Sequence, residues 1–215
     1  MAAKASLFDL EYVVFDFETT GLHPERGDEV IEMGAIKLRG DIPTGETFQS
    51  LIDIQKPVPK EASNIHGIRN EDLKGKPLLR DVLPQFIQFI GTKILIAHNA
   101  EFDLGFLKKA LRSLPSFNFQ NHCIDTLQLS RMLFSYEKSH NLDALANRFG
   151  FFPEEFTDQR HRSIGDCLLT AKIFGELLKS LKRKKMATLH GIRSCMLTLS
   201  KAPSSISEQS LQLFL

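Results

Sequence analysis

The chain has 215 residues and a formal net charge of +1, with 42% apolar and 25% charged residues. These values suit one globular domain with a sizeable core and a tail, of the kind found in the cytoplasm. A charge so close to neutral excludes proteins that hold nucleic acid through a strong overall positive field. Three cysteines without a C-x-x-C pair argue against a structural zinc site or a disulfide framework. The sequence lacks an apolar run of transmembrane length and a signal-peptide core, so no membrane partner is expected.

The pattern of apolar residues predicts an α/β fold. Apolar β-favouring runs are typical of strands, and apolar residues at helical spacing are typical of helices. A three-strand antiparallel meander, followed by strand–helix units that add parallel strands, indicates a mixed sheet flanked by helices. In chain order we expect strands at 11–18, 29–38 and 46–54, with turn residues Gly40, Pro43 and Gly45 between the last two, then a helix at 77–90, a strand at 94–98, a helix at 102–113, a strand at 122–125, and helices at 126–134, 141–149 and 163–182.

The first acidic motif follows the apolar run Tyr12–Phe15. Asp16 and Glu18 stand two positions apart in D-F-E-T-T-G. An extended backbone points both carboxylates to one face, and Gly21 allows the chain to turn away. Taken alone, the motif is more typical of a strand that ends in a polar loop.

The second motif follows the apolar run 94–97. His98 and Asn99 close that run, and Asp103 falls in the first turn of the next predicted helix. An acidic residue there also complements the helix dipole, which is the simpler interpretation of this motif alone.

The third motif opens the longest predicted helix. Asp166 lies in its first turn, and His161 stands five positions earlier. That spacing would put the two on different faces of a helix, so we expect His161 in the preceding loop. A loop histidine on its own is more often a plain surface residue.

The three motifs gain meaning together, because all lie at or near strand-to-helix junctions, where open α/β sheets place their sites. Clustered carboxylates are costly to bury unless a cation pairs with them, and Mg²⁺ prefers oxygen ligands. Two such ions, about 3.5–4 Å apart, can stabilise both the attacking and the leaving oxygen of a phosphodiester. The pattern therefore predicts a metal-dependent nuclease.

The ordered motifs resemble those of the DEDDh family of 3′→5′ exonucleases, and are most similar to the epsilon-type proofreading subunits of bacterial DNA polymerase III. They agree as D-F-E-T-T-G, H-N-A-x-F-D and H-x-x-x-x-D, with support from 64–68, 123–127 and 141–145. The resemblance covers residues 7–181. It implies an RNase H-like fold, two Mg²⁺ or Mn²⁺ ions, and release of nucleoside 5′-monophosphates from a 3′ end.

The resemblance also implies roles for single residues. Asp16, Glu18, Asp103 and Asp166 would be the metal ligands, with Asp16 between the ions, and His161 would be the general base. An imidazole suits that role because it titrates at about pH 6.5. Leu22 and Phe102 fit a core equally well, and His66 fits a turn cap. The pocket for the terminal nucleotide would be formed by Glu18, Thr19, Gly21, Leu22, His66, Phe102 and His161.

The chain beyond the last predicted helix differs in character, so we expect an exonuclease domain at 7–182 and a partner-binding tail at 183–215. The basic run 182–185 suits a helix C-terminus, and contact with DNA or a polymerase is the alternative. Residues 186–199 are too apolar for a solvated linker. They either dock on the domain or form a contact with the polymerase III alpha subunit. After the spacer Pro203–Ser205, the end of the chain resembles the Gln-plus-Leu-Phe peptides that bind the bacterial sliding clamp, with a spacing one residue longer. Simple packing of the tail is the alternative. The apolar residues at this end of the chain are Leu211, Leu213 and Phe214.

Three functions stay open on the sequence alone. The first is a proofreading exonuclease that acts on single-stranded DNA 3′ ends. The second is a free-standing ribonuclease of the same fold, which trims RNA 3′ ends or short oligonucleotides. The third is a structural brace for a polymerase, which the complete set of motif residues disfavours as a sole role.

Overall fold

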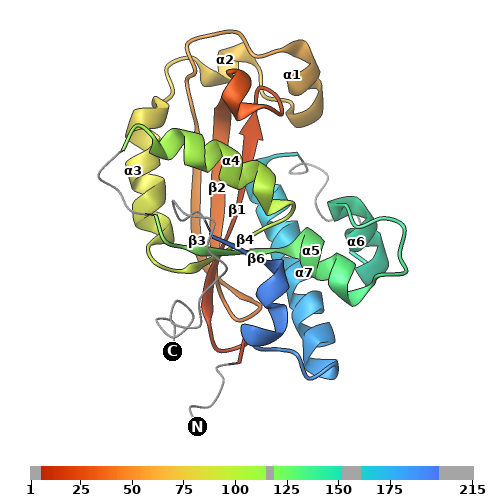
Figure 1. The fold of residues 1–215 in the computed structure, drawn as a ribbon. Coiled ribbons are helices and arrows are strands. Elements are labelled where there is room, and N and C mark those ends of the chain that lie inside the picture. Colours follow the sequence, from red (N-terminus) through yellow and green to blue (C-terminus); the bar gives the residue numbers. More distant parts are fainter. Residues whose placement is uncertain (1–5, 115–118, 152–160, 199–215) are drawn as a thin grey trace.

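The computed structural model describes residues 6–114, 119–151 and 161–198. Its centre is a six-stranded mixed sheet with the order β3-β2-β1-β4-β5-β6 (Figure 1). The first three strands form the expected antiparallel meander, β4 and β5 continue in parallel with β1, and β6 is antiparallel to β5. The strands are β1 (Glu11–Thr19), β2 (Val30–Arg39), β3 (Ile42–Leu51), β4 (Ile94–Ala97), β5 (His122–Asp125) and β6 (Met196–Thr198).

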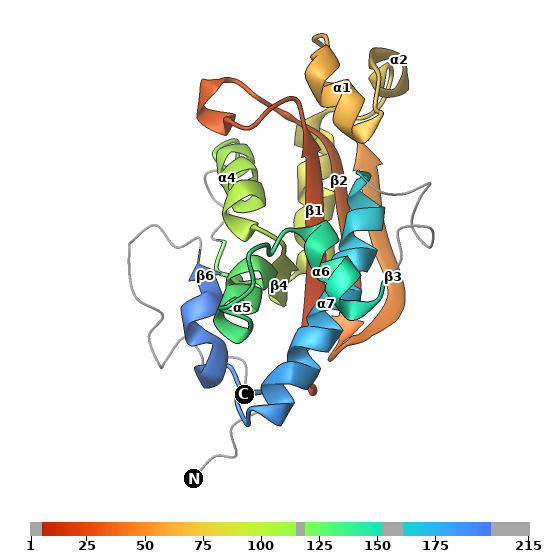
Figure 2. The same ribbon diagram turned by 90° about the vertical axis from the view of Figure 1, so that its right-hand side faces the viewer.

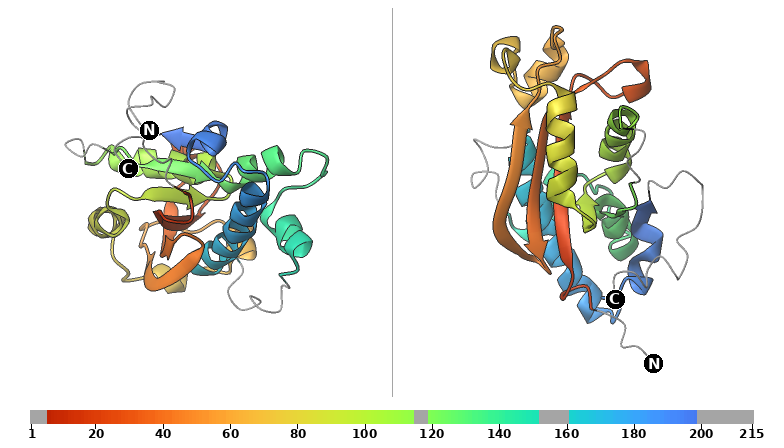
Figure 3. Two further views of the ribbon diagram at one scale, coloured as in Figure 1. Left: turned by 90° about the horizontal axis from the view of Figure 1, so that it is seen from below. Right: turned by 90° about the vertical axis from the view of Figure 1, so that its left-hand side faces the viewer.

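Helices cover both faces of the sheet because successive side chains of each strand point to opposite sides. Tyr12 and Val14 of β1 pack in a core with α5, α6 and α7, which lie together on one face (Figure 2). Val13 and Phe15 pack in a second core with α3 and α4 on the other face (Figure 3). The helices are η1 (Pro24–Arg26), α1 (Lys60–His66), α2 (Asn70–Leu73), α3 (Leu79–Ile90), α4 (Ala100–Leu111), α5 (Thr126–Leu133), α6 (Leu142–Phe149), α7 (Ser163–Arg183) and η3 (His190–Cys195). None of the helices in the described ranges combines the length and the apolar character that a membrane span needs.

The predicted fold class is confirmed, and most predicted elements lie within two residues of the observed ones. The third strand was predicted wrongly, because it begins at Ile42 rather than at residue 46. The turn is a tight one at Gly40 and Asp41, with a positive φ at Gly40, so Pro43 and Gly45 lie within the strand. β3 tolerates them because it is at the edge of the sheet, where a proline removes no ladder hydrogen bond.

The sheet extends to Thr198, past the domain boundary expected at residue 182. The backbone of β6 pairs with β5, and Leu189, Ile192 and Met196 are buried in the core beneath α5 and α7. Of the two interpretations of residues 186–199, docking on the domain therefore describes these three side chains, and the polymerase contact stays a prediction. The spacer and the apolar residues Leu211, Leu213 and Phe214 lie outside the described residues.

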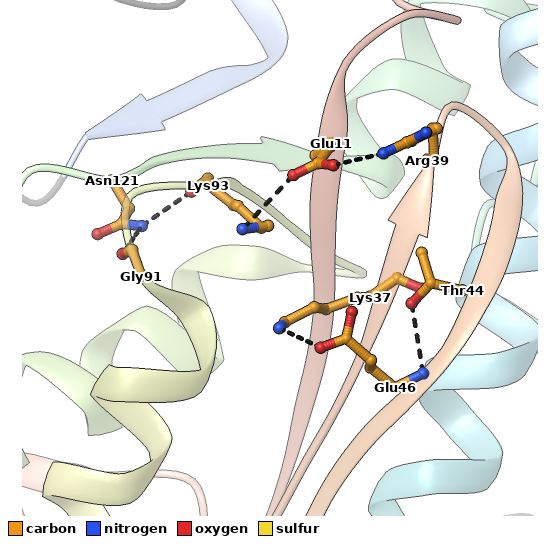
Figure 4. A network of polar contacts seen from close by, with 8 residues as sticks. All are labelled: Glu11, Lys37, Arg39, Thr44, Glu46, Gly91, Lys93 and Asn121. Atoms are coloured by element: carbon orange, nitrogen blue, oxygen red, sulfur yellow. Dashed lines mark hydrogen bonds and ion pairs between the residues drawn. The ribbon is translucent and has the colours of Figure 1, made fainter.

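A polar network links neighbouring strands at the far end of the sheet, where β1 begins (Figure 4). Glu11 at the start of β1 pairs with Arg39 at 3.1 Å and with Lys93 at 3.5 Å. The side-chain amide of Asn121 donates to the carbonyls of Gly91 and Lys93, both at 2.8 Å. These contacts tie β2, β4 and β5 to β1. Exposed ion pairs of this kind contribute at most about 1 kcal/mol each, so the two apolar cores carry most of the stability.

Candidate active site

Three acidic side chains meet at the face of β1 that α7 covers. Asp16 and Glu18 of β1 and Asp166 of α7 each offer a carboxylate oxygen, and these oxygens lie within 4.8 Å of one another. Asp166 is buried, and the other two are half-buried. Carboxylates at this separation repel one another unless cations are present, and their oxygens are the ligands that Mg²⁺ and Mn²⁺ prefer. The donor set therefore fits a divalent metal ion.

The start of α7 brings Asp166 to β1 by packing directly on β2. Asp16 is opposite Gly34 in the β1–β2 ladder, and Glu18 is opposite Glu32. A Cβ on Gly34 would lie only 2.5 Å from the Ser163 hydroxyl, so the absence of a side chain there allows the first residue of α7 to touch the strand. The expected placement of Asp166 in the first helical turn is confirmed.

The fourth acidic residue, Asp103, approaches β1 from α4. Asp103 is buried, and its Oδ1 accepts a hydrogen bond from the backbone N–H of Phe17 at 3.0 Å. Phe17 stands between Asp16 and Glu18, so Asp103 lies against the same segment of β1. Burial raises the pKa of Asp103 to about 7, and the nearby charge of Asp125 acts in the same direction.

Asp125, the last residue of β5, holds the start of α4 in place. Asn99, the residue before α4, has a left-handed backbone with a φ of 60°. The Oδ1 of Asp125 accepts hydrogen bonds from the backbone N–H of Asn99 at 3.1 Å and of Leu127 at 2.9 Å. Asp125 thereby joins the beginnings of α4 and α5 and fixes the turn from which Asp103 projects.

His161 lies in the loop before α7, as expected, and its side chain is exposed. Its backbone has a φ of 57°, a conformation that is strained for a residue with a side chain. His161 is an electrostatic neighbour of His66, which also lies close to the backbone of Thr19. The loop therefore holds His161 on the same side of the molecule as the residues that follow β1.

His66 presents an unpaired donor. Its side chain is 5% exposed, and its Nδ1 accepts a hydrogen bond from the backbone N–H of Ile68 at 3.0 Å. Burial lowers the pKa of His66, so the ring is neutral near pH 7 and carries its proton on Nε2. Among the residues that the structure describes, Nε2 has no hydrogen-bond partner. His66 thus caps a turn, as the simpler interpretation held, and its buried Nε2 is a donor without a partner among the described residues.

The remaining pocket candidates follow β1 or lie on α4. The Thr19 hydroxyl donates to the carbonyl of Gly21 at 2.7 Å, which shapes the turn out of the strand. Leu22 is 71% exposed, so the core alternative is wrong for this residue. Phe102 is partly buried and packs on Phe106 with ring centroids 5.1 Å apart, so it belongs in part to the core, as its alternative held.

Two residues near the site were missed by the sequence analysis. Glu32 of β2 is fully buried, and Arg162 binds its carboxylate through Nη2 at 2.7 Å and through Nε at 3.2 Å. Burial raises the pKa of Glu32, but the hydrogen bonds from Arg162, Ser163 and Gln49 outweigh this effect and bring the pKa below its ordinary value. A single acidic residue inside the apolar run of β2 was the available signal.

A polar groove of about 640 Å³ begins beside this pair. Basic side chains from the segment around α2 line it together with Arg162, and two acidic residues stand among them. The groove is thus close to the acidic cluster and carries more positive than negative groups. Its charged lining residues are Arg69, Glu71, Asp72, Lys74, Lys76 and Arg162.

Comparison with known proteins gives one family. The model of the exonuclease family RNase_T matches residues 13–174. A DNA polymerase III subunit epsilon-like protein of Rhodobacter capsulatus is 38% identical over 192 residues, which are 88% of this chain and 27% of that protein. The chain therefore spans less than a third of that relative. The DNA polymerase III subunit epsilon of Aquifex aeolicus is 35% identical over 178 residues, which are 83% of this chain and 85% of that protein.

The fold has solved counterparts as well. The nuclease domain of 3′hExo, a DEDDh family member bound to rAMP, superimposes with a TM-score of 0.66 at 19% identity, over 81% of this chain and 94% of that one. At this identity the likeness concerns the fold, and it agrees with the mixed sheet flanked by helices.

Proposed function

The chain belongs to the RNase T exonuclease family, and from this premise we propose that it removes nucleotides from the 3′ ends of DNA strands, as a proofreading nuclease of the DNA polymerase III epsilon type. The observation that supports this best is the meeting of Asp16, Glu18 and Asp166 within 4.8 Å. The three come from two segments that are about 150 residues apart in the sequence, and the fold brings them together beside the buried Asp103.

Asp16, Glu18, Asp103 and Asp166 would hold two divalent ions, Mg²⁺ or Mn²⁺. Such ions, when bound, lower the pKa of water and stabilise charge on the phosphodiester oxygens. The burial of Asp103 and Asp166 excludes bulk water from one side of the cluster, which strengthens electrostatic interactions there.

His161 would take the proton from the attacking water. Its exposed side chain in the loop before α7 allows proton exchange with solvent, and an imidazole can act as a base near neutral pH. The strained backbone of His161 fits this role, since such conformations persist where the surrounding structure enforces them.

The terminal nucleotide would lie among Thr19, Gly21, Leu22, His66 and Phe102. The free Nε2–H of His66 suits a sugar or phosphate oxygen, and the exposed side chain of Leu22 suits the face of a base.

The partners in this proposal are the alpha subunit of DNA polymerase III and, through the C-terminal tail, the sliding clamp. Family membership of the epsilon type supports the first. The apolar ending of the sequence supports the second.

Matched DNA and RNA single strands, labelled at the 5′ end and offered with Mg²⁺, test the activity and the sugar preference together. We expect stepwise shortening from the 3′ end of DNA, inhibition by EDTA, and recovery with Mg²⁺ or Mn²⁺. Asp16→Asn should lower the rate by at least about 10³-fold, because it removes a charge that the ions require, while the melting temperature stays close to that of the wild type. Faster shortening of RNA would favour a free-standing ribonuclease, and no shortening of either strand would favour the brace.

His161→Ala tests the base separately from the metal site. We expect a loss of about 10²–10⁴-fold in kcat, with Mn²⁺ binding retained when it is measured by calorimetry. Loss of Mn²⁺ binding in this variant would make His161 a ligand and would contradict the assignment.

A further inference from the structure

We propose that Glu32 and Arg162 are positioning residues for the exonuclease reaction, which act by holding the junction between His161 and α7 on strand β2. This inference rests on the proposed function, because it takes His161 as the base and Asp166 as a metal ligand. Neither Glu32 nor Arg162 needs to touch the substrate or the ions.

The Glu32 carboxylate is the point of attachment. It is 0% exposed and accepts four hydrogen bonds: two from Arg162, one from the backbone N–H of Ser163 at 3.0 Å, and one from the Gln49 amide at 3.0 Å. Burying a carboxylate is costly unless charge and hydrogen bonds compensate it, and here both do. A forked contact from a guanidinium also fixes direction, which a single hydrogen bond does not.

The attached residues lie between the two catalytic groups along the chain. Arg162 follows His161 directly, and its carbonyl accepts the backbone N–H of Asp166 at 3.0 Å. One carboxylate on β2 therefore sets the position of the residue after the base and of the helical turn that carries the metal ligand. The strained backbone of His161 needs such an attachment, because a free loop would relax to a more favourable φ.

The position of Glu32 in the sheet supports the same role. Glu32 is opposite Glu18 in the β1–β2 ladder, and Gly34 is opposite Asp16. The residues that hold the start of α7 are thus next to the residues that would hold the ions. A shift of about 1 Å in a reacting group can cost about 10²-fold in rate, so a precise attachment here has a direct effect on turnover.

Arg162→Lys is the most informative variant, since it keeps the positive charge and removes the fork. We expect kcat on a 5′-labelled DNA strand to fall at least about tenfold, with KM and Mn²⁺ affinity within about twofold of the wild type. Arg39→Lys is the matched control, because Arg39 makes an exposed contact with Glu11 at the far end of the sheet, and it should change kcat by less than about twofold.

A double-mutant cycle with Glu32→Gln tests whether Arg162 acts through Glu32. If it does, the kcat of the double variant should be no lower than the kcat of the less active single variant, because both changes break the same contact between Arg162 and Glu32. Effects on kcat that multiply, or a change in KM alone, would show that Arg162 meets the substrate directly and would overturn the inference. If Glu32→Gln does not fold, the kcat and KM of Arg162→Lys decide the matter alone.

The controls separate this inference from the proposed function. A wild-type protein that is inactive, or a His161→Ala variant at the wild-type rate, contradicts the proposed function. A wild-type protein that is active and loses activity in His161→Ala, together with an unchanged kcat in Arg162→Lys, contradicts only the positioning role.

Discussion

Asp103 is an acidic residue whose pKa is raised by burial. It is buried, and in the absence of a cation its pKa is raised to about 7 from an ordinary value of 3.8. Without metal, the folded protein therefore keeps a proton that the unfolded chain has released. Unfolding then releases a proton between these two pKa values, so the contribution of Asp103 to stability is lost as the pH rises from about 4 to about 7.

Asp103→Asn should remove this pH dependence, because the amide oxygen can still accept the Phe17 N–H and cannot titrate. In EDTA, we expect the variant to be more stable than the wild type at pH 8, by up to about 4 kcal/mol, with the difference shrinking as the pH is lowered toward 4. Thermal melts from pH 4 to 8 measure this. A difference that stays constant with pH would show that Asp103 does not titrate in this range. Saturating Mg²⁺ should reverse the order at pH 8, since only the wild type has the full ligand set.

The start of α7 is the element whose position matters most for the site. Its first residue packs on β2 at Gly34, where an added Cβ would lie 2.5 Å from the Ser163 hydroxyl and 2.8 Å from the Ser163 carbonyl carbon. The second of these atoms is backbone, so the helix itself would have to move. Asp166 would move with it, away from Asp16 and Glu18.

Gly34→Ala should therefore lower both stability and turnover. We expect a loss of about 1–3 kcal/mol in the free energy of unfolding, as for other overpacked sites, and a fall in kcat that persists well below the melting temperature. Gly105→Ala in α4 is the matched control, because its Cβ would meet only Pro24 at the ordinary distance of 3.6 Å. That variant should gain up to about 1 kcal/mol from helix propensity. Equal melting temperatures for Gly34→Ala and the wild type would contradict the close packing.

The molecule as a whole has almost no net charge, so the proposed binding of a nucleic-acid strand would depend on a local surface. The groove around α2, which Arg162 also lines, is a described surface with more basic than acidic side chains. Lys74→Gln combined with Lys76→Gln should raise KM several-fold for a long single strand and leave a dinucleotide unaffected, because only the longer strand reaches the groove. The salt dependence of KM should weaken by about 0.7 in log–log slope for each phosphate that the variant no longer neutralises. Lys179→Gln on α7, where Lys179 pairs with Glu176, serves as the control, and an equal effect there would indicate general charge instead.

The described part of the C-terminal region ends with strand β6 at Thr198. A chain that ends at Lys182 would lose β6 together with the buried side chains of Leu189, Ile192 and Met196, each of which contributes about 1.5–3 kcal/mol. We expect it to melt at least about 10 °C lower.

A chain that ends at Thr198 should keep its melting temperature and its rate on short strands and lose clamp binding. The full chain with Leu213→Ala and Phe214→Ala should behave in the same way. Calorimetry with the clamp measures this, and equal affinity for all three folded forms would leave the tail without that role.

The sequence by itself determined the elements and the acidic residues of the site. Strand alternation and helical spacing depend on neighbours in the chain, so β1, α4 and α7 could be predicted with Asp16, Asp103 and Asp166 at their ends. The turn at Gly40 was predicted too long, and the strand β6 was missed. The first depends on the edge position of β3, and the second on pairing with β5, which lies about 70 residues earlier.

Only the tertiary structure decided which distant groups meet. Glu32 and Arg162 are 130 residues apart, and no local pattern joins them. The order of strands sets β2 beside β1, the approach of α7 over Gly34 sets Ser163 on β2, and these two facts together bring Asp166 to the carboxylates of β1. The free donor of His66 likewise depends on what its neighbours leave unpaired. The sequence determines which chemical group stands at each position. Pairing, burial and the resulting pKa values arise only from contacts between residues that are distant in the sequence.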